Sequence, residues 1–433
     1  MDSLSQWAKL GSILFIISVL IGLGFLIKYI LNKRSNLNTP GNIVAIKNSQ
    51  VSALESRWLG KLQSRSGLLG NFQGTSTPQP QQLLINTAVF STRLTGYLGP
   101  YESGVFSEDN AVRIALNAGS RCLILEIDYE QGIYEPKLIY RDSWAMKRSI
   151  NTGSINAVAK SIAARAFSSS NNGAPPSVAS DPLIVVLYFL RTPNISKDPI
   201  SYAKYLGAVA EQLEPISQLL LGQTPQGDFR RQALESQLFF TNYSVFNNKI
   251  ILLNNADTKI FRNLSNMGLA GELGPKQDLD YMTHVRLYGR ESPSPFGITG
   301  TSGDSVKPAA VVTSSSYWLN TPTDRAQNAV ELTKSAWTLV MPPVSYDTGS
   351  TAADDKKKQE NLFKIYGVHS IPITIFEDSK TTDNFSARGS IFNNTSWAAK
   401  PQLIQYVPPL PIPIQKPFPQ ANSGGGRVVS PKL

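Results

Sequence analysis

The chain has 433 residues and a formal net charge of +10, and its one cysteine, Cys122, excludes an intramolecular disulfide. Much of the charge lies outside the central part, because residues 31–70 hold six basic side chains against one acid and residues 416–433 hold three basic side chains and no acid. The nearly neutral body excludes a protein that binds nucleic acid over a basic face, so we expect no nucleic-acid partner.

The first predicted element is a membrane span. Residues 10–27 contain no charged side chain, and the apolar stretch resumes after Lys28. This length crosses a bilayer, so we predict a short tail (1–9) followed by a transmembrane helix (10–32). A cleaved signal peptide is the alternative, but the stretch is longer than the apolar part of a signal peptide and no small-x-small cleavage pattern follows it.

The charges that flank the span predict its orientation. Lys28, Lys33 and Arg34 lie on its C-terminal side, against Asp2 and Lys9 before it. By the positive-inside rule we expect a single-pass protein whose body faces the cytosol. The body also carries Asn-x-Ser sequons at Asn194, Asn242 and Asn263. These would suggest glycosylation in a lumenal body, but in an Asn- and Ser-rich sequence we attribute them to chance.

A basic juxtamembrane linker, residues 33–82, follows the span. Apolar residues recur in it at helical spacing with basic residues opposite them: Val51, Leu54, Trp58 and Leu62 against Arg57, Lys61 and Arg65. This pattern predicts an amphipathic helix. Two placements are open, an interfacial helix on the bilayer or a helix packed on the folded body. The basic residues suit anionic headgroups, at about 1 kcal/mol each near the surface.

Buried apolar runs alternate with helix-like stretches in the body. Residues 183–190 and 250–253 are continuous apolar runs, as expected for parallel strands covered on both faces. Between them, residues 200–220 carry apolar side chains every three or four positions, which indicates an amphipathic helix. The alternation predicts an α/β fold, a single eight-stranded barrel over residues 83–406, with functional groups at the carboxyl ends of the strands.

Several segments of the body resemble one enzyme family. Residues 88–96 read Ala-Val-Phe-Ser-Thr-Arg-Leu-Thr-Gly and resemble the Ser-Ser-His-Asn-Thr-Tyr-Leu-Thr-Gly stretch in the catalytic X domain of phosphoinositide-specific phospholipase C (PLC). Residues 119–141 resemble the family's Gly-Cys-Arg-Cys, Glu-Leu-Asp and Ile-Tyr-His-Gly run. Later segments also resemble the family: residues 161–167, 181–187, 248–253, 337–341 and 366–376. The resemblance implies a TIM-type (β/α)8 barrel of the PLC-like phosphodiesterase superfamily.

The residues on which the family's chemistry depends are changed in this chain. That chemistry is attack of the inositol 2-hydroxyl on the adjacent phosphodiester, and it needs a general base and a general acid. Histidine fills both roles because its pKa lies near neutrality. Phe90 stands at the first histidine position and Arg141 at the second. Neither side chain relays a proton at physiological pH, so we expect a pseudoenzyme without catalytic residues.

The calcium site that the resemblance implies is also depleted. Ser91 takes the asparagine position, and the later glutamate position falls among residues 187–190, which hold no carboxylate. Glu126 and Asp128 remain, on alternate residues of one strand and therefore on one face. Two carboxylates are too few for calcium, which takes about six to eight oxygen ligands. We therefore expect no metal and no cofactor.

Two interpretations of Arg141 remain open. It forms an ion pair with one of the two carboxylates in place of the metal, or it joins Arg93 in binding the phosphate of a phosphoinositide headgroup. An active phosphodiesterase would need His284 or His369 to enter the site from outside the motifs, and His369 lies in a hydrophobic run typical of a packed histidine.

Residues 407–433 form a proline-rich C-terminal arm. The arm begins Val-Pro-Pro-Leu-Pro-Ile-Pro and later contains a Gly-Gly-Gly run. Such a composition favours an extended polyproline II segment that docks on a partner, and a disordered tail is the alternative.

These features favour a structural function. An inactive barrel between a membrane anchor and a docking arm suits a minor capsid or membrane-anchor protein of a large DNA virus with an internal membrane. Its expected partners are then the bilayer and capsid proteins, and its expected place is the virion, between the inner membrane and the capsid. A cellular membrane scaffold would have the same sequence features. A headgroup-binding module and an active phosphodiesterase are the alternatives.

Overall fold

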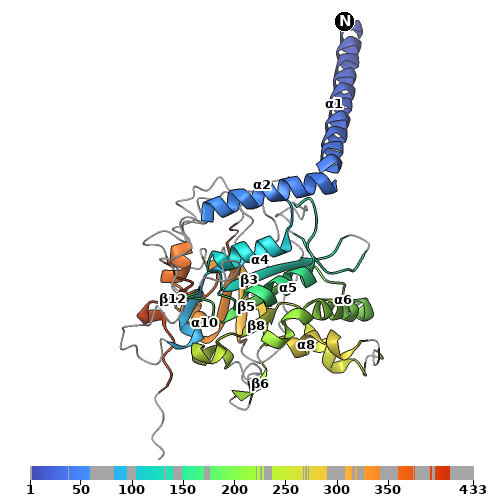
Figure 1. The fold of residues 1–433 in the computed structure, drawn as a ribbon. Coiled ribbons are helices and arrows are strands. Elements are labelled where there is room, and N and C mark those ends of the chain that lie inside the picture. The colour runs from blue at the N-terminus through green and yellow to red at the C-terminus, as the bar shows by residue number, and fades with distance from the viewer. Residues whose placement is uncertain are drawn as a thin grey trace, which may run out of the picture.

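The computed structural model describes the two N-terminal helices and most of the elements of the body (Figure 1). The described residues are 2–37, 39–58, 82–94, 104–130, 133–139, 149–169, 176–220, 222–224, 227–228, 237–266, 268, 271, 273–289, 308–314, 317–318, 326–341, 359–373, 375, 391–392 and 395–409. Arg141 and most of the proline-rich arm lie outside them, and so do Lys61, Leu62 and Arg65 of the linker.

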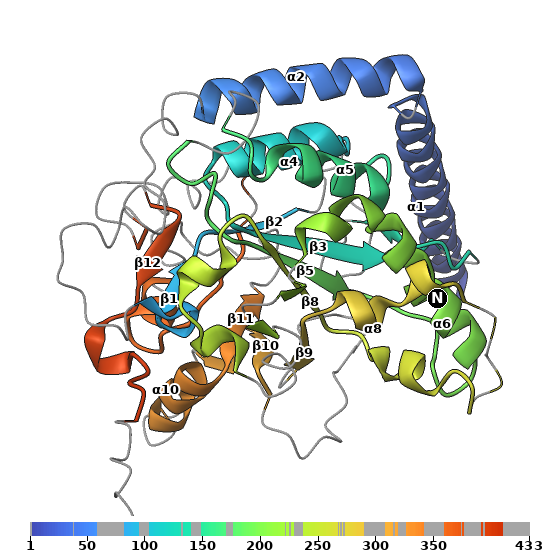
Figure 2. The ribbon, with the colours of Figure 1, turned by 60° about the horizontal axis from the view of Figure 1, so that its bottom comes forward.

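A curled sheet of seven parallel strands forms the centre of the body (Figure 2). Its apolar runs are buried on both faces, as the continuous hydrophobic sequences predict. In spatial order the strands are β11 (Trp337–Met341), β10 (Ala310–Ser314), β9 (Val285–Gly289), β8 (Ile250–Asn254), β5 (Leu183–Phe189), β3 (Cys122–Asp128) and β2 (Ser91–Arg93). A short strand, β4 (Lys137–Leu138), pairs antiparallel with β3.

An extended segment lies between the two edges of this sheet. The carbonyl of Ser370 accepts a hydrogen bond from the Val340 N–H of β11 at 2.9 Å. On its other side, the carbonyl of His369 accepts from the N–H of Val89 at 2.8 Å, and Ile373 donates to Ser91 of β2 at 3.0 Å. Ser370 and Ile373, within the predicted last strand (366–376), therefore form isolated bridges to β11 and β2, the two edges of the sheet.

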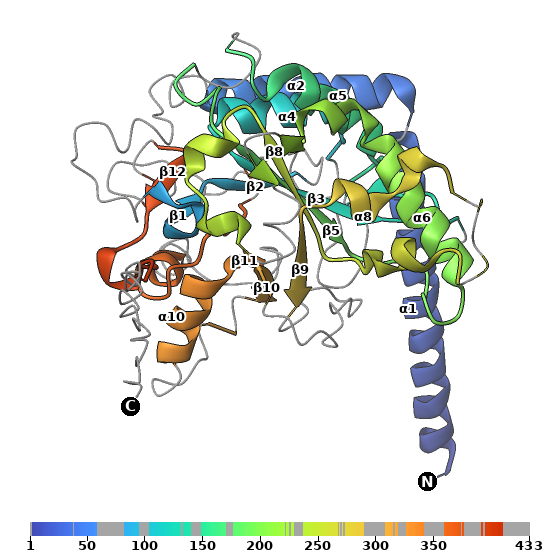
Figure 3. The same ribbon diagram turned by 90° about the horizontal axis from the view of Figure 1, so that it is seen from below.

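Helices surround the curled sheet (Figure 3). Local signals begin several of them: Ser154 accepts a hydrogen bond from the Ala157 N–H at the start of α5, and Asp198 does the same for Ser201 at the start of α6. The helices of the body are α4 (Glu108–Asn117), α5 (Ile155–Arg165), α6 (Pro199–Gln212), α8 (Leu279–Met282) and α10 (Ala326–Ser335). Short strands β1 (Thr87–Val89) and β12 (Trp397–Ala399) pair antiparallel, as do β6 (Gln223–Thr224) and β7 (Gly227–Asp228).

Short 3-10 helices complete the body. They are η2 (Leu84–Asn86), η3 (Glu214–Leu219), η4 (Leu238–Phe240), η5 (Tyr243–Phe246), η6 (Thr258–Asn263), η7 (Pro275–Gln277) and η10 (Gln402–Ile404).

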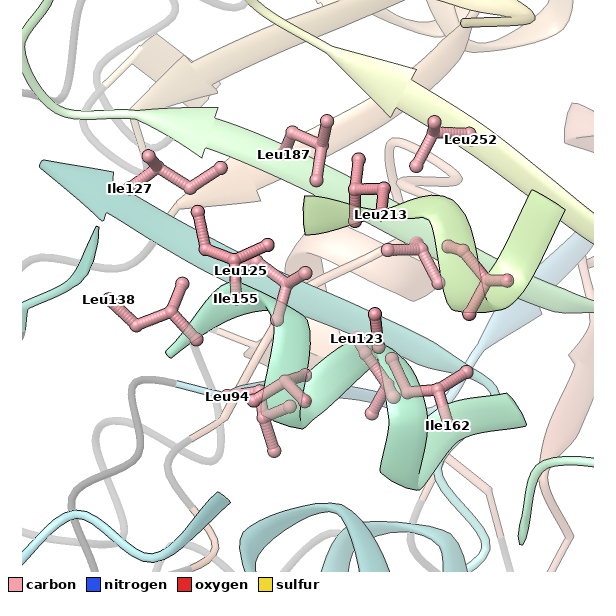
Figure 4. Close-up of a cluster of buried hydrophobic side chains, with 14 of the residues drawn as sticks. Leu94, Leu123, Leu125, Ile127, Leu138, Ile155, Ile162, Leu187, Leu213 and Leu252 are labelled. Atoms are coloured by element: carbon pink, nitrogen blue, oxygen red, sulfur yellow. The ribbon is translucent and has the colours of Figure 1, made fainter. Parts of the chain in front are cut away.

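The core has two layers, because alternate residues of each strand face opposite sides of the sheet. Leu123, Leu125 and Ile127 of β3 pack against Ile155 and Ile162 of α5 in the layer between sheet and helices (Figure 4). Cys122 and Ile124 belong to the second cluster, inside the curl of the sheet, with Ile184, Val186, Tyr188, Leu339 and Trp337. The inner and outer faces of each strand can therefore be assigned.

Two helices precede the body. The first, α1 (Asp2–Leu37), includes an apolar stretch, Gly11–Asn32, with a mean hydropathy of 2.5 and no burial against the rest of the chain. It is long and apolar enough to be a membrane span or a signal sequence, and it coincides with the predicted span of residues 10–32.

The second helix, α2 (Pro40–Trp58), lies along the body (Figure 1). Leu54 is only 2% exposed and joins the layer between sheet and helices, and Val51 packs against the same layer. One side of this helix therefore packs on the folded body.

Candidate functional site

The inner face of the sheet gathers charged side chains near the carboxyl ends of β2 and β3. Glu126 and Asp128 share the strand face of Cys122 and Ile124, as their alternate spacing predicts. Arg93 is the last residue of β2, and its register places it opposite Ile124. Three of the residues selected from the sequence therefore come together at one end of the curled sheet.

Arg93 and Glu126 form a buried ion pair. The Arg93 Nε and Nη2 atoms lie 2.7 Å and 2.6 Å from the same carboxylate oxygen, Oε1. The other oxygen, Oε2, is buried without a hydrogen-bond partner among the described residues. Burial raises the pKa of Glu126, and the charge and hydrogen bonds of Arg93 offset part of that rise. The arginine predicted to contact phosphate is therefore bound to a carboxylate of the chain itself.

Tyr188 of β5 lies opposite Glu126 in the sheet register. The ring is 2% exposed. Burial raises the pKa of the phenol well above its ordinary value, and the nearby Glu126 charge raises it further. The phenol therefore keeps its proton at physiological pH and does not serve as a base in its resting state.

Asp128 has a different arginine as its partner. The Arg191 Nε atom lies 2.7 Å from Oδ1 of this fully buried carboxylate, and the same oxygen accepts a hydrogen bond from the Tyr129 N–H at 2.8 Å. The Arg191 guanidinium also donates to the Tyr129 carbonyl at 2.6 Å and lies 4.6 Å from the centre of the Tyr129 ring. Its side chain is 23% exposed, so the pair lies at the rim of the site.

Sequence reasoning missed Arg191. The available signal was its position two residues after β5, at the same end of the sheet as Asp128, where parallel strands place functional side chains. An ion pair in place of the metal was expected from Arg141, which lies outside the described residues. Among the described residues, each of the two carboxylates is paired with an arginine, Arg93 or Arg191, and the pairing of Arg141 stays a prediction.

Phe90 does not lie with the two carboxylates. Its ring is fully buried in the layer between sheet and helices, with an edge contact to Phe392 at a centroid distance of 5.5 Å. Val89 belongs to the inner cluster, and Ser91 also points inward, so Phe90 points the other way. The side chains of Phe90 and Asp128 therefore lie on opposite faces of the sheet.

Ser91 lies deeper than the carboxylates and is fully engaged. Its hydroxyl donates to the Val89 carbonyl at 2.8 Å and lies 2.7 Å from the Ser370 hydroxyl. The Ser370 hydroxyl also lies 3.8 Å from the Cys122 sulfur. Burial raises the pKa of Cys122 to about 12, so the thiol stays neutral. This cluster packs the interior rather than extending the pair of carboxylates.

Ring nitrogens of both histidines, His284 and His369, are engaged with backbone groups of the chain. His369 is fully buried; its Nδ1 accepts a hydrogen bond from the Thr338 N–H at 2.9 Å, and its Nε2 lies 2.8 Å from the Ile85 carbonyl. Burial lowers the pKa of His369 well below its ordinary value, and the charge of Lys400 lowers it further. The Nδ1 atom of His284 accepts from the Leu252 N–H at 2.9 Å. His369 is thus the packed histidine that the sequence predicted.

The donor set around the carboxylates does not fit a calcium ion. Each carboxylate has a guanidinium as its neighbour, whose positive charge repels a second cation. Within the described ranges, no three His, Cys, Asp or Glu side chains are grouped as metal ligands. Calcium requires about six to eight oxygens, so these residues are arranged for ion pairing.

No family model matches the chain, and no curated protein sequence matches it. Solved structures do match. The crystal structure of L. pealei PLC21 aligns with 74% of this chain at 14% identity and a TM-score of 0.46, and that of S. officinalis PLC21 aligns with 74% at 15% identity and a TM-score of 0.44. The aligned parts are 38% and 37% of those proteins, so the chain spans less than half of their length.

A bacterial structure also matches over nearly its full length. The calcium-dependent phosphoinositol-specific phospholipase C from Pseudomonas sp. aligns with 75% of this chain and 97% of its own, at 10% identity and a TM-score of 0.38. These are similarities of fold at low sequence identity. They do not indicate the activity of this chain, which has to be inferred from its own residues.

Proposed function

We propose that the chain is a membrane-anchored structural protein, built on a PLC-like barrel of eight strands that does not cleave phosphodiesters. The observation that supports this most is the pairing of Glu126 with Arg93 and of Asp128 with Arg191. In a catalytic site of this type the carboxylates would hold a cation or accept a proton. Here each one is neutralised by the chain itself.

The placement of the histidines supports the same proposal. A phosphodiesterase of the expected type needs a general acid and a general base within hydrogen-bond reach of its substrate. His369 bonds to Thr338, the second residue of β11, whereas Asp128 is the last residue of β3. Because the strands are parallel, these residues mark opposite ends of the sheet. Moving His369 to the carboxylates would break two buried hydrogen bonds at once.

Headgroup binding is the weaker alternative. It would use Arg93 as a phosphate contact, but this guanidinium already donates twice to Glu126 and is only 5% exposed. A phosphate would have to displace the buried carboxylate of Glu126 from Arg93 and leave it without a partner. Leaving one member of a buried ion pair unpaired costs about 3–5 kcal/mol. The existing ion pair therefore favours a scaffold over a phosphate receptor.

The proposed role has three parts. The apolar segment of α1 holds the chain in a bilayer as a single-pass anchor, with the body on the cytosolic side by the positive-inside rule. The barrel is a rigid spacer, and the proline-rich arm (407–433) docks on partner proteins. This combination suits a minor capsid or membrane-anchor protein that lies between the internal membrane and the capsid of a large virus.

Fractionation of particles tests the proposal. Virus particles purified from producing cells are expected to contain the chain, and stripping their internal membrane with detergent should release it. A variant lacking residues 10–32 should be lost from the particles, whereas a variant lacking residues 416–433 should remain membrane-bound but fail to associate with capsid proteins. Recovery of the chain only in host-cell membranes, and never in particles, would contradict the virion role.

A further inference from the structure

Hydrogen bonds fix the corner between α1 and α2. Asn36 lies in the last turn of α1, and its carbonyl lacks a partner within that helix. It accepts hydrogen bonds from the Asn42 side-chain amide at 2.8 Å and from the Thr39 hydroxyl at 3.3 Å. The Ile43 N–H, in the first turn of α2, bonds to the Thr39 carbonyl at 2.9 Å. The first turn of α2 thus closes the end of α1.

This corner lies close to where the hydrocarbon core would end. The apolar segment ends at Asn32 and α1 at Leu37, a rise of only about 8 Å at 1.5 Å per residue. The headgroup layer on each side of a bilayer is of similar thickness, about 5–8 Å. If the apolar segment spans the membrane, α2 begins at the boundary between headgroups and water.

The other side of α2 is fixed to the body. Leu54 is buried in the core, and the Gln50 side chain accepts a hydrogen bond from the Val105 N–H at 3.3 Å. Glu55 forms an ion pair with Arg113 of α4. These contacts lie along one face of the helix, whereas Ser49 and Ser52 of the opposite face are exposed, and so is Asn48 at the edge of that face. Figures 1 and 2 show α2 lying over α4 along much of the body.

We propose that α2 is a membrane-surface strap, which holds the α4 side of the body against the lipid headgroups. The inference rests on the proposed membrane anchor, because only a spanning α1 brings the corner to the bilayer. The occupant of the exposed face of α2 is then the headgroup layer of the same membrane. The barrel would have one fixed face toward the membrane, and η10, in the red segment that lies below α2 in Figure 1, would stand away from the headgroups.

Site-directed labelling in vesicles tests this directly. The native cysteine is fully buried and its pKa is raised to about 12, so introduced cysteines can be labelled selectively. The full chain would be reconstituted in vesicles of phosphatidylcholine and phosphatidylserine as three variants, each with a fluorophore: Asn48→Cys, Leu20→Cys and Leu403→Cys. Leu20 lies within the apolar segment and is 62% exposed, and Leu403 is 92% exposed. Quenching by lipids carrying a nitroxide on the headgroup or on the acyl chain is measured.

The expected result is loss of fluorescence at Asn48→Cys with the headgroup quencher, loss at Leu20→Cys with the acyl-chain quencher, and no loss at Leu403→Cys. Quenching at Leu20→Cys without quenching at Asn48→Cys would overturn the strap and leave the anchor intact. Absence of quenching at Leu20→Cys would overturn the anchor itself. As a matched control, a flexible Gly-Ser insertion after Asn38 should abolish the quenching at Asn48→Cys but not at Leu20→Cys.

Discussion

Arg93 and Glu126 form an ion pair in the interior of the curled sheet, in which two nitrogen atoms of the guanidinium lie 2.6 Å and 2.7 Å from one carboxylate oxygen. Removing one partner of a buried pair costs about 3–5 kcal/mol, whereas replacing both by apolar residues is close to neutral. We therefore expect Arg93→Met to lower the free energy of unfolding by this amount, and Arg93→Met/Glu126→Leu to recover most of it. Denaturant unfolding in detergent, followed by circular dichroism, measures both.

The penalty of Arg93→Met should also depend on pH. Burial raises the pKa of Glu126 in the folded state, and the variant removes the arginine that counteracts this rise. A raised folded-state pKa gives stability that is present below the unfolded-state pKa and is lost as the pH rises through the folded-state value. The variant should therefore be less destabilised near about pH 5 than near about pH 8. An equal penalty at both pH values would contradict the buried pair.

The contribution of His369 to the free energy of unfolding should have the opposite pH dependence. Its pKa is lowered in the folded state by burial and by Lys400, so its contribution to stability is full above the unfolded pKa near about 6.5 and is lost as the pH falls. The loss is at most about 1.4 kcal/mol per pH unit. His369→Gln removes the titrating group, so its unfolding free energy should fall less than that of the wild type between about pH 7.5 and pH 5.5. Equal slopes for the two proteins would show that His369 is not buried as a neutral ring.

The close approach of Gly153 to the Phe106 ring can be tested by substitution. A Cβ atom built at this position would lie 2.4–2.6 Å from ring atoms of Phe106, a fully packed side chain. Gly153 also exchanges two backbone hydrogen bonds with Leu138, at 2.9 Å and 3.0 Å, so the backbone cannot retreat. Gly153→Ala is expected to cost about 1–3 kcal/mol. Gly222→Ala is the matched control, since nothing lies within 4 Å of its Cβ position, and thermal unfolding compares the two.

The sequons test which side of the membrane the body occupies. Asn194 and Asn263 are exposed, so a glycosylation enzyme could reach them in a lumenal body. Expression in cells with a secretory pathway should leave both unmodified, as judged by an unchanged gel mobility on glycosidase treatment. An added N-terminal extension with its own sequon should be modified, because the short tail lies across the membrane. Glycans on Asn194 or Asn263 would show that the body lies on the lumenal side and would contradict the predicted orientation.

The sequence predicted the strands well because their apolar runs are continuous. The predicted runs at 183–190 and 250–253 correspond to β5 and β8, and the predicted helix at 200–220 corresponds to α6 followed by η3. The helix ends at Gln212 because Pro215 has no N–H to continue it. The closing segment at residues 369–373 has isolated bridges in place of a long ladder, a distinction that hydrophobic runs do not carry.

The site was predicted in part, for a similar reason. Alternate spacing is local, so the shared face of Glu126 and Asp128 could be read from the sequence. The partner Arg191 could not, because it lies 63 residues further along the chain and reaches Asp128 only through the pairing of β5 with β3. Phe90 was assigned to the site by its position in a motif, whereas the direction of its side chain depends on the face of the sheet that it occupies.

The most direct test is an assay for lipid hydrolysis. The full chain, reconstituted in vesicles that contain phosphatidylinositol, is incubated with and without Ca²⁺, and release of inositol phosphate is measured against the Glu126→Gln/Asp128→Asn variant. We predict no release above the level of vesicles alone for either protein, because both carboxylates are held by arginines and both histidines by the backbone. Calcium-dependent release by the wild type that the double variant abolishes would show that the site is catalytic.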